Sequence, residues 1–65
     1  MIRVFVNVDG KTHVTEVSSK THTSLRAGAF LRNRPIQFFL QRVVKEYGTL
    51  TEDNILKFMD ENWIL

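Results

Sequence analysis

Hydrophobic residues occupy every second position at the start of the chain. They are Ile2, Val4, Val6 and Val8. A period of two is typical of a β-strand with one buried face, and β-branched side chains favour strands. Asp9-Gly10 follows this run and suits the two positive-φ positions of a type I′ turn. The pattern therefore predicts a β-hairpin in which residues 11–17 form the second strand.

A two-residue turn also predicts how the two strands pair. Phe5 should face Val14, and Arg3 should face Glu16, which places opposite charges across the ladder. One face of the hairpin then carries Val17 together with the alternating hydrophobic residues of the first strand. The other face carries Phe5 and Val14 among polar groups.

The clearest helical periodicity lies in the second half of the chain. Hydrophobic side chains recur at i, i+3, i+4, i+7, i+8 and i+11, and they are Ile36, Phe39, Leu40, Val43, Val44 and Tyr47. This spacing predicts an amphipathic helix over 36–47. Pro35 suits the first turn of that helix, and Gly48 suits its C-terminal end.

A second helix is predicted after Thr51, which is a good N-cap. Glu52 and Asp53 would lie in its first turn beside the positive end of the helix dipole, and Thr49 with Glu52 forms a competing capping box. One face of this helix carries Ile55, Phe58, Met59 and Trp63. We expect Ile55, Phe58 and Met59 to form the core with Phe39, Leu40 and Val43 of the preceding helix.

The segment between the hairpin and these helices is harder to interpret. Residues 18–22 are polar and are predicted to form a connection. Thr23 would then cap a short helix over 24–32, although Gly28 weakens this prediction. A third strand at 24–33 is the alternative, because a long structureless loop is uncommon in so small a domain.

The chain of 65 residues has room for one domain, 1–65. The predicted fold class is α+β, an N-terminal β-hairpin packed against two or three short helices.

The chain has no cysteine, and a secreted domain of this size usually needs disulfides, so we expect a cytoplasmic location. No apolar run reaches the roughly 20 residues that span a bilayer, so no membrane partner is expected. The oligomeric state is left open.

No group of residues predicts catalysis or metal binding. His13 lies on a predicted strand and His22 in a polar segment, and neither has a second ligand at metal spacing. The adjacent carboxylates at 52–53 suit a helix N-terminus, and those at 60–61 suit a solvated helix end. We expect no cofactor, no metal, no catalytic residue and no small-molecule substrate, and we expect that the protein is not an enzyme.

The distribution of charge is more informative than the net charge of +2. Residues 17–45 contain no acidic side chain, whereas every charged side chain from Glu46 onward except Lys57 is acidic. On the predicted helix, Arg34, Phe38, Arg42 and Lys45 share the face opposite the apolar stripe. Cations around an aromatic ring are typical of a nucleic-acid surface, because cations meet phosphates and a ring stacks on a base. The alternative is that Phe38 packs inside the domain and the cations are only solvated.

The sequence thus predicts a non-catalytic regulatory binding module that engages an acidic macromolecule through a basic face of residues 20–45. The first choice of partner is nucleic acid, and the second is an acidic protein surface. The candidate residues are Lys20, Arg26, Arg32, Arg34, Phe38, Arg42 and Lys45. The alternative is a small protein-binding adaptor or inhibitor. It would dock through the hairpin face with Phe5 and Val14, or through the apolar C-terminus with Trp63.

Two segments resemble the ubiquitin-like β-grasp family. Residues 5–6, 10–12 and 16–17 are similar to its first hairpin, and Thr49-Leu50 with Asn54-Ile55 is similar to the stretch before its last strand. The resemblance implies that residues 63–65 begin a final strand. The chain departs from the family at 36–47, where the family has strands, and it lacks the terminal Gly-Gly, so the resemblance implies no role in conjugation.

Overall fold

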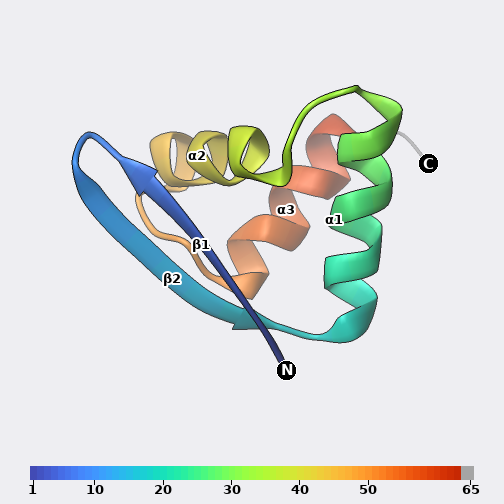
Figure 1. Ribbon diagram of the computed structural model, residues 1–65, viewed down its shortest axis with the longest axis horizontal. Coiled ribbons are helices and arrows are strands. Elements are labelled where there is room, and N and C mark those ends of the chain that lie inside the picture. Colours follow the sequence, from blue (N-terminus) through green and yellow to red (C-terminus); the bar gives the residue numbers. More distant parts are fainter. Residues whose placement is uncertain (64–65) are drawn as a thin grey trace.

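The computed structural model describes residues 1–63 and consists of a two-stranded antiparallel hairpin followed by three helices (Figure 1). In chain order the elements are β1 (Ile2–Val8), β2 (Lys11–Val17), α1 (Ser19–Leu31), α2 (Ile36–Tyr47) and α3 (Glu52–Asn62). The predicted α+β fold class is confirmed. None of the helices described within 1–63 is long and apolar enough to cross a membrane.

The hairpin has the predicted turn and register. Asp9 and Gly10 have φ values of 53° and 80°, the positive values that a type I′ turn requires. Phe5 pairs with Val14 and Arg3 pairs with Glu16. The alternating valines of β1 are therefore buried on one face, while Phe5 and Val14 are exposed on the other.

The prediction for residues 18–23 is wrong, because α1 begins at Ser19 directly after β2. Ser18, not Thr23, is the N-cap, and its side-chain oxygen accepts a hydrogen bond from the Thr21 backbone N–H at 3.2 Å. The residues expected to form a polar connection are thus the first turn of the helix. Residues 24–31 are helical as well, so the third-strand alternative is also wrong.

The two later helices follow the predicted pattern. Helix α2 spans the predicted range and ends at Gly48 in the left-handed conformation, with φ of 86°. Pro35 is the N-cap of this helix rather than part of its first turn. Thr51 caps α3 by accepting a hydrogen bond from the Asn54 backbone N–H at 3.1 Å, so the competing capping box does not form. Trp63 is the C-cap of α3.

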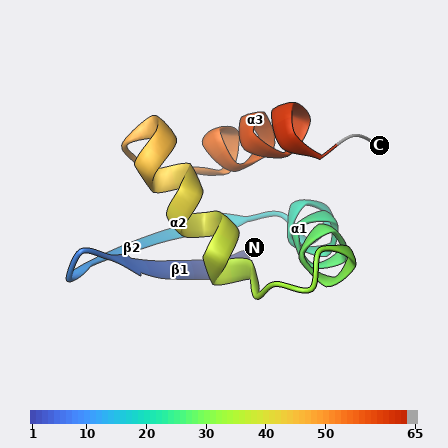
Figure 2. The ribbon, with the colours of Figure 1, turned by 90° about the horizontal axis from the view of Figure 1, so that it is seen from above.

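All three helices lie on the apolar face of the hairpin or at its end (Figure 2). Helix α2 crosses β1, and α3 packs beside α2 and against β2. The most deeply buried side chains come from every element except β1, and they are Val17, Leu25, Leu40, Val43, Ile55 and Phe58. The predicted core residues of α2 and α3 are all buried. Residues 64 and 65, for which the family resemblance implies a strand, lie outside the described residues.

Candidate functional site

The six predicted cations are all exposed, but the fold distributes them over three places. Lys20 and Arg26 lie on α1, and Arg42 and Lys45 lie on α2. Arg32 and Arg34 lie in the connection between these helices. The charges therefore surround the α1–α2 half of the molecule and do not form one continuous helical face.

Phe38, the aromatic residue at the centre of the predicted face, is half-buried. Its ring meets that of Phe39 edge to face, with centroids 5.2 Å apart. The guanidinium carbon of Arg34 lies 4.9 Å from the centroid of the Phe38 ring, and that of Arg42 lies 5.1 Å from the centroid of Phe58. These two predicted cations thus lie over the domain's own aromatic rings, and the Phe38 ring is covered by both Arg34 and Phe39.

The turn that ends α1 places a different aromatic residue among cations. Asn33 adopts the left-handed conformation with φ of 56°. Its N–H donates to the carbonyl of Phe30 at 3.1 Å, and the N–H of Arg34 donates to the carbonyl of Ala29 at 3.0 Å. These two bonds form a Schellman motif, in which the chain reverses immediately after the helix. The reversal brings Arg34 back beside the last turn of α1.

Phe30 is the most exposed large hydrophobic residue described, with 84% of its surface accessible. It lies one helical turn after Arg26, so the two side chains are neighbours on α1. It also lines a shallow hollow of about 290 Å³ together with Ala29, Asn33, Arg34 and Pro35. No acidic residue lines this hollow. We call Arg26, Phe30 and Arg34 the cationic-aromatic patch.

Phe30 is not among the predicted site residues, because the sequence pattern gives the short helix predicted over 24–32 no buried and exposed faces. A signal was present. With the helix begun at Ser19, the buried positions are Thr21, Leu25, Gly28 and Ala29, and Phe30 falls outside that stripe.

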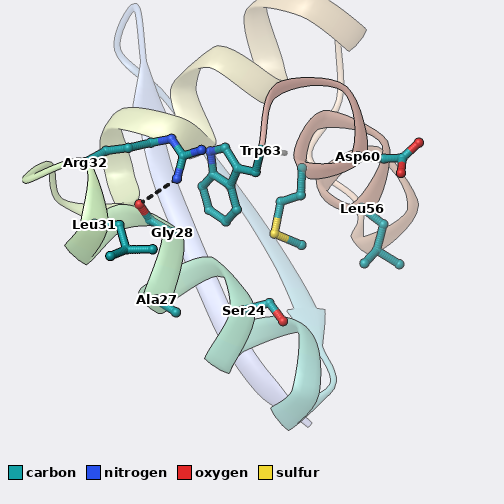
Figure 3. Close-up of a pocket in the computed structure, with 9 residues that line it drawn as sticks. Ser24, Ala27, Gly28, Leu31, Arg32, Leu56, Asp60 and Trp63 are labelled. Atoms are coloured by element: carbon teal, nitrogen blue, oxygen red, sulfur yellow. Dashed lines mark hydrogen bonds between the residues drawn. The ribbon is translucent and has the colours of Figure 1, made fainter. Parts of the chain in front are cut away.

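A second concave surface lies between α1 and α3 (Figure 3). This groove has a volume of about 700 Å³. One wall comes from α1 and the residue after it, and the other from α3 and its C-cap. The lining residues are Ser24, Ala27, Gly28, Leu31, Arg32, Leu56, Met59, Asp60 and Trp63. Nothing in the sequence pattern predicted this groove.

The two helices that form the groove are joined at both ends. Near their N-termini, the Glu52 carboxylate accepts a hydrogen bond from the Ser18 backbone N–H at 2.9 Å. This bond, with further bonds from the Thr21 and Ser18 side chains, lowers the pKa of Glu52 below its ordinary value. Near their C-termini, the Trp63 indole lies directly against the backbone of Gly28. Helices α1 and α3 therefore run roughly parallel, as Figure 1 also shows, and the groove lies between them.

Arg32 belongs to this groove rather than to the cationic-aromatic patch. Its guanidinium carbon lies 4.9 Å from the centroid of the Trp63 ring, and its Nη1 donates to the Gly28 carbonyl at 3.1 Å (Figure 3). Lys20 lies one turn before Ser24 on α1, so it too is on the groove side of the helix.

The alternative protein-binding residues are separated by the fold. Phe5 and Val14 form a cross-strand pair on the bare face of the hairpin, 56% and 52% exposed. Trp63 is buried, 5% exposed, in contact with the core through Phe39. The apolar C-terminus as far as Trp63 is thus packed against α1 and not presented beside the hairpin face.

The two histidines and the Tyr47–Glu61 pair lie outside both the cationic-aromatic patch and the groove. His13 pairs with Val6 across the hairpin, and His22 lies in α1. No group of three or more potential ligands that could hold a metal ion occurs among the residues searched, 1–63. The Tyr47 hydroxyl donates to the Glu61 carboxylate, and this bond raises the pKa of Tyr47 to about 12.

Comparisons with protein-family models, with curated proteins and with solved structures found no match to this chain.

Proposed function

We propose that this domain is a non-catalytic module that binds single-stranded nucleic acid through the cationic-aromatic patch, with the cations of α2 contributing to the attraction. The observation that carries the proposal is the 84% exposed ring of Phe30 between Arg26 and Arg34. This exposed ring lies one helical turn after Arg26 and lines a hollow with Arg34, and it has no role in the core of the domain.

The chemistry of the patch suits an unpaired strand. Arginine guanidinium groups attract the phosphate backbone whatever the sequence. A base that is free of its partner can stack on an exposed aromatic ring, whereas the bases of a duplex are already stacked on each other. Phe30 replaces Phe38 in this role because Arg34 and Phe39 cover the Phe38 ring.

The cations of α2 extend the same electrostatic field. Arg42 and Lys45 are exposed, and the nearest acidic side chain in the sequence is Glu46, with none between residues 17 and 45. Phosphates that meet the patch would therefore encounter further positive charge along α2 rather than repulsion. The acidic side chains of α3 restrict the proposed contact to the α1–α2 side.

The experiment is a salt titration of binding to short single-stranded and duplex DNA and RNA oligomers. Arg26→Ala and Arg34→Ala should each weaken binding on all sequences and reduce the slope of log affinity against log salt by about one unit. Phe30→Ala should leave that slope nearly unchanged and cost about 1–3 kcal/mol on single strands only.

Two exposed residues on the hairpin provide matched controls. Lys11→Ala removes an exposed cation from the turn, and Phe5→Ala removes an exposed ring from the bare hairpin face. Both should bind like the parent. Absence of binding at low salt refutes the proposal, and so does binding that is equally insensitive to Phe30→Ala and to Phe5→Ala.

The exposed pair Phe5–Val14 favours a second candidate, an adaptor that docks a protein on the hairpin face. Burial of apolar surface depends little on salt, whereas phosphate binding weakens steeply with it. Binding of a protein partner that resists salt and is lost on Phe5→Ala would favour this candidate over the first.

A further inference from the structure

The groove between α1 and α3 has apolar side chains that no other part of the described chain covers. Leu31 on one wall is 79% exposed, and Leu56 on the other is 44% exposed. Met59 and Trp63 form part of the surface between them. Single exposed leucines are ordinary, but leucines on opposite walls of an apolar groove are typical of an interface.

The charges along the two walls have opposite signs. The α1 wall carries Arg32 at its C-terminal end and Lys20 at its N-terminal end. The α3 wall carries Asp60 at its C-terminal end, and Asp53 lies one turn before Leu56 on the same side of the helix. All four side chains are exposed. Because α1 and α3 run parallel, each cation lies at the same level along the groove as one of the carboxylates.

This arrangement is complementary to itself. In a symmetrical dimer, a residue i of one chain that meets residue j of the other implies that j also meets i. A two-fold axis parallel to the helices would place α1 of each chain against α3 of the other. Arg32 would then face Asp60 of the second copy, Lys20 would face Asp53, and the leucines would close over the groove.

We propose that the α1–α3 groove is the interface of a homodimer, with a second copy of this chain as its occupant. The charge pattern favours this occupant because one chain supplies both the basic wall and the acidic wall that the other needs. The proposal does not depend on nucleic-acid binding, since Arg26, Phe30 and Arg34 do not line the groove.

The first test is the molecular mass in solution, measured by sedimentation equilibrium across a wide range of protein concentration. We expect a mass that rises from that of the 7.6 kDa chain towards twice that value. Leu56→Lys should shift the transition to a concentration at least about tenfold higher, because it places a charge in the apolar centre. Val14→Lys, the matched change on the bare hairpin face, should not shift it.

The second test uses charge reversal to detect the pairing between chains. Asp60→Lys and Arg32→Glu should each weaken self-association by about tenfold, because each creates two like-charge contacts in a symmetrical dimer. An equimolar mixture of the two variants should regain parental association. In the mixed dimer both contacts again join opposite charges.

Variants with the same charge changes away from the groove serve as controls. Glu46→Lys matches Asp60→Lys, and Lys11→Glu matches Arg32→Glu, and their mixture should behave like the parent protein. Circular dichroism establishes that each variant is folded. This matters most for Arg32→Glu, because Arg32 also contacts Trp63.

Three results would overturn the proposal. The first is a single-chain mass at every concentration. The second is a dimer that Leu56→Lys and the charge reversals leave unchanged, which would place the contact elsewhere. The third is a monomer whose Trp63 fluorescence responds at this groove to an amphipathic peptide, which would make a different protein the occupant. Loss of nucleic-acid binding would leave the dimer proposal intact, and the reverse also holds.

Discussion

A single methyl group added at Gly28 tests how closely α1 packs against the end of α3. A Cβ atom built on Gly28 would lie within 3.0 Å of ring atoms of Trp63, a separation that real Cβ atoms essentially never show. The atoms that it would meet are three carbons of the indole ring rather than the end of a flexible side chain. Relief therefore requires the indole or the helix to move.

The indole has little room to move. It meets the Phe39 ring edge to face with centroids 5.4 Å apart, and the Arg32 guanidinium also lies over the indole ring. Overpacking of a core costs typically about 1–3 kcal/mol, and three clashing ring atoms indicate the upper end of that range. Alanine regains about 1 kcal/mol over glycine in a helix interior. The expected net effect of Gly28→Ala is a loss of about 2 kcal/mol of unfolding free energy.

The assay is urea denaturation followed by far-UV circular dichroism, with Trp63→Leu as the second arm of a double-mutant cycle. Without the indole, the added methyl group has no clash, so Gly28→Ala should become neutral or stabilising by up to about 1 kcal/mol. Ala27→Gly measures the effect of glycine at a neighbouring exposed position of the same helix. The reasoning is refuted if Gly28→Ala stabilises the parent protein, or if its cost is the same with and without Trp63.

Three further changes test other parts of the fold. Gly10→Val should destabilise the hairpin by about 1 kcal/mol or more in urea denaturation, because a β-branched residue resists the positive φ of 80°; equal stability would contradict the turn. Leu40→Ala should cost about 2–5 kcal/mol because Leu40 is fully buried, and a smaller loss would contradict the core. Glu52→Gln should lower the melting temperature at pH 7, because folding lowers the pKa of Glu52 through the Ser18 N–H. The folded state favours the charged carboxylate, so the difference in melting temperature between the parent protein and Glu52→Gln should be largest above the ordinary pKa of 4.5. It should disappear as pH falls through the lowered pKa of the folded state, and a difference that persists in acid would contradict the role of the hydrogen bond from Ser18.

The hairpin, α2 and α3 could be predicted from the sequence because their signals are local. Alternating valines before Asp9-Gly10 specify both the turn and the register. The stripe from Ile36 to Tyr47 specifies a helix, and Gly48 specifies its end. In each case the residues that determine the structure lie within a few positions of one another, so no distant contact is needed to interpret them.

Helix α1 shows where local reasoning was insufficient. Its buried stripe includes Thr21 and Gly28, neither of which counts as an apolar signal. Gly28 is unfavourable in an isolated helix, and only the indole of Trp63 explains why glycine stands there. The C-terminal end could have been found, because Asn33 followed by Pro35 is typical of a Schellman motif.

The sequence by itself determined the hairpin, α2, α3 and the separation of positive from negative charge along the chain. Only the tertiary structure decided which side chains face water and which meet each other. It buried one side of Phe38 beneath Arg34, left Phe30 exposed, and turned Arg32 onto Trp63. It also created the groove, because the parallel placement of α1 and α3 depends on contacts between residues far apart in the chain, Ser18 with Glu52 and Gly28 with Trp63. Periodicity within one helix cannot specify such contacts, since they depend on where the other helix lies.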